Sequence, residues 1–156
     1  MTLGIFHVLM VIEMKKTIVF LSVAVLSVML CSCVVKDTRL GKEEIIGIVL
    51  ENEEQLRKDI KNNNFEASLN ITGIRGINVE YDGTVDFDCG GFGFGPSTSY
   101  AGFYYNVDND MSAIWCAMGT PKEAEGDSYL YESEGGTKRY YTEKIVDGFY
   151  YYEAAF

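Results

Sequence analysis

Histidine and cysteine, which most often serve as nucleophiles, bases or metal ligands, are scarce in this chain. The one histidine is His7, and the four cysteines are Cys31, Cys33, Cys89 and Cys116. His7 lies in an N-terminal segment that we expect to be removed from the mature protein. The remaining domain would then have no histidine for a Ser-His-Asp triad, a Cys-His pair or a histidine-bound metal.

The other polar patterns predict neither a metal site nor a cofactor. Two cysteines without a histidine supply half of a typical zinc site. Asn106, Asp108 and Asp110 have the alternate spacing that begins a calcium loop, but Met111 stands where such a loop needs glycine. We therefore interpret this segment as a turn.

Two carboxylates could form an acid-base pair of the kind that hydrolases use. Asp86 and Asp88 alternate with Phe87, which places both carboxylates on one face of a predicted strand. Solvation of an outer sheet face explains such a pair equally simply. We therefore name no catalytic residue from the sequence.

A glycine-rich segment covers residues 89 to 96. It has the composition of a phosphate-binding loop, but no lysine follows it, it ends at Pro96 and it opens no helix. We interpret it as a mobile or tightly bent loop between strands. Phe92 and Phe94 within it either pack inward or stand exposed as a contact patch.

Tyrosines are concentrated in the second half of the chain. The run Tyr150-Tyr151-Tyr152 must place rings on both faces of a strand, so some of them should lie outside a helix-covered core. Together with Tyr104 and the two phenylalanines of residues 89 to 96, they form a candidate binding surface for a glycan, a peptide or a protein. The alternative, which we favour, is that tyrosine simply suits strands and tolerates half-exposure.

One amphipathic helix is predicted from Lys42 to about Ile60. Its apolar residues recur at helical spacing: Ile45, Ile46, Val49, Leu50, Leu56 and Ile60. Acidic residues crowd the start of this segment and basic residues its end, which is the order that the helix dipole favours. We expect Asn62-Asn63-Asn64 to end the helix.

After Phe65 the apolar period changes to two, which predicts antiparallel strands. The clearest hairpin turns at residues 81 to 83, and a three-residue loop with a left-handed Gly83 would pair Val79 with Val85. The same register pairs Ile77 with Phe87. Further strands are expected near residues 100–106, 111–118, 127–132, 138–145 and 149–156.

These elements predict one α+β domain over residues 42–156. In it, the amphipathic helix packs on one face of an antiparallel β-meander of about six strands. The short polar segment 34–41 would serve as a tether. The whole chain has a formal net charge of −10, which makes nucleic acid and anionic lipid head groups poor partners.

Leu30-Cys31-Ser32-Cys33 ends an apolar run that follows Lys15 and Lys16. This arrangement resembles the lipobox of bacterial lipoprotein signal peptides. The resemblance implies that residues 1–33 are a signal peptide with a signal helix, ending at a lipidated Cys33; Met14 is a candidate true start. The apolar run is shorter than the roughly 20 residues of a spanning helix. An uncleaved anchor and ordinary secretion are the alternatives.

Cys89 and Cys116 are the cysteines that would remain after cleavage and lipidation. Outside the cytoplasm such a pair favours a disulfide. Two buried thiols in neighbouring strands are the alternative.

Several segments resemble those of small exported proteins of Gram-positive gut bacteria that have no assigned function: residues 89–91, 102–105, 141–145 and 150–153. The resemblance covers about residues 42–156 and implies an envelope location without an activity. We therefore predict a lipid-anchored protein on the extracytoplasmic side of the cell membrane that acts as a non-catalytic binding or interaction module. A small carboxylate-based hydrolase is the alternative, and a passive structural role in the envelope is a third hypothesis.

Overall fold

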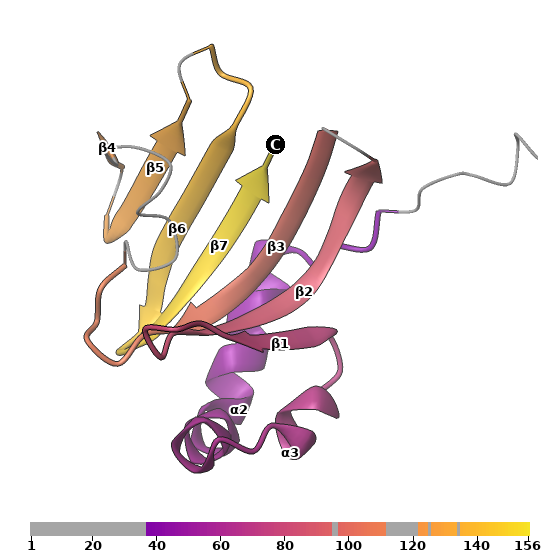
Figure 1. Cartoon of the computed structure of the whole chain (residues 1–156), viewed down its shortest axis with the longest axis vertical. Helices are drawn as coiled ribbons and strands as arrows, with labels where there is room; N and C mark the ends of the chain where they lie inside the picture. The colour runs from indigo at the N-terminus through magenta and orange to yellow at the C-terminus, as the bar shows by residue number, and fades with distance from the viewer. Residues whose placement is uncertain (1–36, 95–96, 112–121, 125, 134) are drawn as a thin grey trace, which may run out of the picture. The chain divides into compact units, whose positions relative to one another are not determined.

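The computed structural model describes residues 37–94, 97–111, 122–124, 126–133 and 135–156. The chain divides into two units, residues 1–35 and 36–156, and all described residues belong to the second. This second unit is an α+β fold, in which helix α2 covers one face of an antiparallel sheet of seven strands (Figure 1). The predicted signal helix and the lipidation site Cys33 lie outside the described residues.

The sheet has the strand order β1-β2-β3-β7-β6-β5-β4, and each neighbouring pair is antiparallel. The strands are β1 (Gly76–Val79), β2 (Val85–Phe94), β3 (Ser97–Tyr105), β4 (Lys122–Glu123), β5 (Ser128–Glu132), β6 (Arg139–Val146) and β7 (Phe149–Ala155).

The expectation of a single meander of about six strands is therefore wrong. Two meanders, β1 to β3 and β4 to β7, are joined by the pairing of β3 with β7. Strands β3 and β7 carry buried side chains on both faces, such as Phe103 beside Tyr104 and Tyr151 beside Tyr152. Strands of this kind need a neighbour on each edge and a layer on each face, so they occupy the centre of the sheet.

The predicted β1–β2 hairpin is confirmed. Val79 pairs with Val85 and Ile77 pairs with Phe87. Gly83 has φ +85°, the left-handed conformation that a three-residue loop requires.

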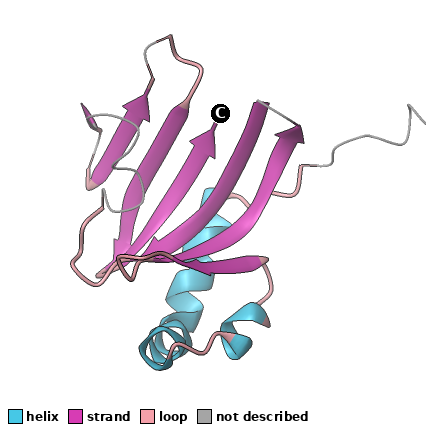
Figure 2. Ribbon diagram, viewed as in Figure 1, coloured by secondary structure: helices cyan, strands magenta, loops and turns pink. Residues whose placement is uncertain are grey.

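The interpretation of the glycine-rich segment as a loop is wrong. Residues 89 to 94 continue β2, with a bulge between Asp88 and Gly91, and pair with β3 (Figure 2). A side chain on Gly91 would meet the Tyr100 ring at 2.9 Å, so glycine lets that ring lie across the strand. The turn residues 95–96 and most of the strand expected at 111–118 lie outside the described residues.

Helix α2 (Lys42–Asn62) begins and ends close to its predicted limits. Its start is capped by the Glu44 carboxylate, which accepts a hydrogen bond of 2.8 Å from the Gly41 N–H. Its end is set by Asn63, which has the left-handed φ of 48°. Among the described residues, no helix is both long enough and apolar enough to span a membrane.

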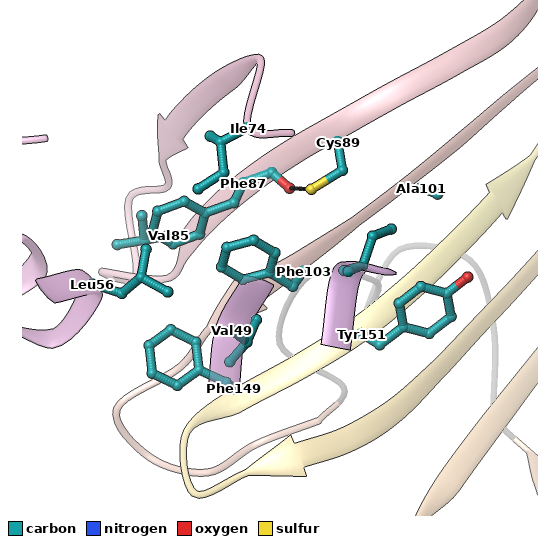
Figure 3. Close-up of a cluster of buried hydrophobic side chains, with 11 residues drawn as sticks. Val49, Leu56, Ile74, Val85, Phe87, Cys89, Ala101, Phe103, Phe149 and Tyr151 are labelled. Carbon is teal, nitrogen blue, oxygen red and sulfur yellow. Dashed lines mark hydrogen bonds between the residues drawn. The ribbon is translucent and has the colours of Figure 1, made fainter. Parts of the chain in front are cut away.

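The core between α2 and the sheet is built from aliphatic residues of the helix and aromatic residues of the strands (Figure 3). Val49 and Leu56 are fully buried there. They belong to the same buried cluster as Phe103 of β3, whose ring stacks on Phe87 of β2 at a centroid distance of 4.5 Å. Leu50, which the pattern included in the apolar stripe, is half exposed.

Candidate functional site

A second buried cluster lies on the sheet face opposite α2 and consists almost wholly of tyrosines. Its buried members are Tyr104, Tyr131, Tyr140, Tyr150, Tyr152 and Ala154. The rings of Tyr104 and Tyr150 are stacked at 5.1 Å. Tyrosine rings thus provide a core on the face that carries no α2.

The Tyr104 hydroxyl links this cluster to neighbouring polar groups. The Tyr104 hydroxyl donates to the Met111 carbonyl and lies 3.0 Å from the Thr142 hydroxyl. Thr142 in turn donates to the Tyr151 carbonyl at 2.9 Å. Burial raises the pKa of Tyr104 far above its ordinary value, so this phenol stays neutral. We conclude that the network is structural.

The predicted tyrosine binding surface requires a correction. Tyr104, Tyr150 and Tyr152 are at most 6% exposed, and Tyr151 lies in the core under α2. These rings are buried because each face of the central strands packs into its own cluster. Among the residues of the predicted surface whose side chains the structure describes, only Phe92 is open, with 43% of its area exposed. The side chain of Phe94 lies outside the described part of the chain.

Asp86 is less exposed to solvent than its position on an outer sheet face predicted. It sits on β2 beside the tyrosine cluster, and its Oδ1 atom is buried with no hydrogen-bond partner among the described residues. Burial raises the pKa of Asp86 to about 6. The Tyr152 hydroxyl partly opposes this rise by hydrogen bonding to the carboxylate, while the nearby negative charge of Asp88 adds to it. Asp86 is therefore not the solvated residue that strand alternation predicts.

Gly102 explains how Tyr152 comes close to β2. A side chain at this position would lie 2.3 Å from the Phe87 carbonyl oxygen and 3.0 Å from the Tyr152 hydroxyl. Only glycine leaves room for the ring to cross the strand toward Asp86. The sequence offers one sign that Asp86 is buried, namely that Gly102 pairs with Tyr152 across two strands. This sign can be recognised only once it is known that β3 and β7 are neighbours.

Cys89 is a free, buried thiol, and the described residues contain no disulfide. Its Sγ atom lies 3.9 Å from the Phe87 carbonyl oxygen, to which the thiol donates (Figure 3). Burial raises the pKa of this thiol to about 12. The structure thus shows Cys89 as an inert core residue rather than half of the predicted bridge; Cys116 lies outside the described residues.

A polar pocket of about 440 Å³ lies between the last turns of α2 and the short helix α3 (Glu66–Leu69). Asp59 at its base is 5% exposed. Its carboxylate accepts hydrogen bonds from the Ser68 N–H (2.9 Å), the Ser68 hydroxyl (2.7 Å) and the Gln55 amide (2.6 Å). These bonds hold α3 against α2. The rim is lined by amide and charged side chains: Gln55, Lys58, Asn62, Asn64, Glu66 and Asn70.

A smaller pocket, of about 280 Å³, lies where residues 37 to 41 cross the sheet. Thr38 anchors this segment, because its hydroxyl donates to the Gly91 carbonyl at 2.8 Å. Arg39 pairs with Asp37 at 2.8 Å and lies over the Phe92 ring at 6.0 Å. The segment that we predicted as a tether is therefore in part packed on β2.

The predicted turn at residues 106 to 110 is confirmed. The Asn106 side-chain oxygen accepts from the N–H groups of Asp108 (2.9 Å) and Asp110 (3.1 Å). Within the described ranges, no group of three or more acidic, histidine or cysteine side chains could hold a metal ion. No family model matches the chain, and comparisons with curated proteins and with solved structures gave no match either.

Proposed function

We propose that the chain is a membrane-tethered lipoprotein, anchored through Cys33 on the extracytoplasmic side, whose folded domain is a non-catalytic binding module. The signal pattern around Cys33 supports the anchor. The observation that carries the binding role is the polar pocket between α2 and α3, which is large enough for a small ligand or the end of a larger one.

The chemistry of this pocket favours a ligand rich in hydroxyl and amide groups. Asn62, Asn64 and Asn70 offer amide donors and acceptors at the rim, and Lys58 adds a cation. The carboxylate of Asp59 already accepts three hydrogen bonds, so it holds the pocket together and is not placed to act as a base. Glycan and peptide groups are the ligands that such a rim can bind.

The tether is tested by replacing the lipidated residue. Cys33→Ser in the full chain should shift the protein from the membrane fraction to the soluble fraction, because the acyl anchor is lost. Cys31→Ser is the matched control and should leave the membrane fraction unchanged. Lipid labelling that persists in Cys33→Ser would refute the anchor.

The binding role is tested with soluble peptidoglycan fragments, which carry both sugar and peptide groups. Titration should shift the side-chain amide resonances of the pocket asparagines in a saturable manner. Asn62→Ala, at the exposed end of α2, should weaken the binding about tenfold, since a lost ligand hydrogen bond costs on the order of 1 kcal/mol or more. Asn78→Ala on β1 is the control. Unsaturable shifts spread over the whole domain would count against the pocket.

A small hydrolase remains the second candidate because of one observation, the raised pKa of Asp86 next to Asp88. Neither of the two described pockets contains Asp86. Hydrolysis of the same peptidoglycan fragments that is abolished by Asp86→Asn would favour the enzyme. If neither binding nor hydrolysis is observed, a passive role in the envelope is the proposal that is left.

A further inference from the structure

The point at which the folded domain meets its proposed tether is set by hydrogen bonds. Thr38 is bonded to Gly91 of β2 through its hydroxyl (2.8 Å) and its N–H (3.4 Å). The backbone contact is close, because a side chain on Gly90 would lie 2.3 Å from the Thr38 carbonyl oxygen. Only residues 34 to 36 separate Cys33 from Asp37. An extended chain spans at most about 3.6 Å per residue, so a tether of this length allows at most roughly 15 Å between the proposed anchor at Cys33 and Asp37.

The end of the sheet next to this point carries exposed aromatic rings. Phe92 is 43% exposed, and Tyr100, on the opposite face, is 42% exposed. The Tyr100 ring contacts that of Phe156 edge-on at 6.4 Å. We call this region, defined by Phe92, Tyr100 and Phe156, the aromatic end of the sheet; it is the end at which β7 reaches the C terminus (Figure 1).

Cations accompany these rings. Arg39 lies over Phe92 at 6.0 Å, and Lys138 lies over Phe156 at 5.9 Å. Exposed Arg139 begins the neighbouring strand β6. The acidic residues Asp37, Glu132 and Glu153 are also present, so the aromatic end is close to neutral. Aromatic rings next to lysine or arginine are the composition that proteins place at the membrane-water interface.

The opposite end of the sheet is acidic. Its turns carry five exposed carboxylates, on Glu80, Asp82, Asp108, Asp110 and Asp147. Among them, Asp147 pairs with Lys144 at 2.7 Å. The formal charge of −10 is therefore spread unevenly, and repulsion from an anionic bilayer is weakest at the aromatic end.

We infer that the aromatic end of the sheet rests on the lipid surface to which Cys33 is anchored, with Phe92 and Tyr100 in the head-group region. This inference rests on the proposed lipidation of Cys33. The contact orients the domain. Helix α2 begins over the middle of the sheet, where Lys42 contacts Glu143, and runs away from the aromatic end for 21 residues, about 31 Å, so the polar pocket at its far end faces away from the bilayer.

The test places a tryptophan at each end of the sheet in the full, lipidated chain. Phe92→Trp and Tyr100→Trp report the aromatic end, and Tyr81→Trp, in the exposed acidic turn, is the control. The proteins are reconstituted into vesicles of phosphatidylglycerol and phosphatidylethanolamine, with or without bromine-labelled acyl chains. The unsubstituted protein gives the background from Trp115.

Bromine-labelled lipid should quench the fluorescence of Phe92→Trp and Tyr100→Trp roughly twofold or more above that of Tyr81→Trp. Equal quenching at both ends, in protein whose mass includes the lipid, would overturn the contact and leave the tether intact. If the mass of the purified protein does not include the lipid, both the proposed tether and the proposed membrane contact are overturned. A tryptophan at position 92 that is shielded from aqueous iodide but not quenched by brominated lipid would mean that another protein, such as a second copy of this chain, covers this end.

Discussion

Asp86 is the residue whose chemistry departs most from what its position suggests. Strand alternation places it on the face opposite α2, where a carboxylate would ordinarily be solvated. The tyrosine cluster on that face removes water from one of its oxygens, which is left without a partner in the described structure. The folded protein therefore favours the protonated form, and the pKa is about 6.

The pH dependence of stability should report this carboxyl. The folded state holds the Asp86 proton more tightly than the unfolded state does. The stabilisation is therefore complete below about pH 4 and is lost as pH rises through about 6. Asp86→Asn should remove this dependence and be more stable than the parent by about 2 kcal/mol at pH 8, measured by urea unfolding.

Asp88→Asn provides the matched comparison for the same measurement. The negative charge of Asp88 contributes to the raised pKa of Asp86. Its removal should move the loss of stability to lower pH without abolishing it. Identical pH profiles for the parent and Asp86→Asn would show that Asp86 is solvated after all.

The thiol of Cys89 should be inaccessible in the folded protein. A chain beginning at Val34 should show no reaction of Cys89 with a thiol reagent until it is unfolded, because the thiol is buried and its pKa is about 12. Unfolding without a reductant should then allow the Cys89 thiol to react with the reagent. Cys89→Ser should lower the thiol count by one. A thiol that appears only after reduction would establish the disulfide that the structure does not show.

At the scale of the elements, glycines decide how the tyrosine-rich strands fit together. Tyr152 crosses Gly102, Tyr100 crosses Gly91, and the Tyr105 ring lies against Gly148. In each case the ring takes the space that a side chain would occupy, so it covers the backbone of a neighbouring segment. These contacts allow strands with consecutive tyrosines to bury rings on both faces.

Two glycine substitutions should have opposite effects on stability. Gly102→Ala should destabilise the domain by about 2–3 kcal/mol, because the added carbon meets the Phe87 carbonyl oxygen at 2.3 Å. Gly47→Ala, within α2 and with nothing within 4 Å, should stabilise it by about 1 kcal/mol. Both values come from urea unfolding. A neutral Gly102→Ala would mean that the backbone of β2 at Phe87 can shift away from the added carbon at little cost.

At the scale of the whole molecule, the pairing of β3 with β7 connects the two meanders. Seven residue pairs join these strands, from Ser99 with Ala155 to Tyr105 with Phe149. The two buried clusters lie on opposite faces of this same pair, so each cluster stabilises the strands that support the other. The domain should therefore unfold as one cooperative unit.

Native-state hydrogen exchange should show a gradient across the sheet. The amides of Phe103 and Tyr151, in the central strands, should be the slowest and should exchange only by global unfolding. Amides of β4, a two-residue strand at the edge, should exchange fastest. Faster exchange in β7 than in β1 would indicate that the meanders separate before the sheet unfolds.

Elements governed by neighbours in sequence were predictable. The limits of α2 follow from its apolar spacing and its asparagine stop, and the β1–β2 register follows from Gly83. The predicted β2 strand was too short because its glycines are typical of a loop. Their pairing with β3 becomes evident only when it is known that the Tyr100 ring lies across Gly91.

The candidate sites were much less predictable than the elements. The sequence left open whether Phe92 packs inward or stands exposed, and the structure shows it partly exposed. The pocket between α2 and α3 was missed because α3 is only four residues long and is held by Asp59, a carboxylate that the helical pattern treats as solvent-facing. A four-residue helix has too little periodicity to be recognised.

The amino-acid sequence by itself determined the α+β class, the amphipathic helix, the hairpin register and the turn at residues 106 to 110, because each depends on local spacing and on turn chemistry. Only the tertiary structure decided that β3 pairs with β7, that the tyrosines form a second core, and that Asp86 is desolvated. These features depend on contacts between residues far apart in the chain and on the exclusion of water, which local patterns do not encode.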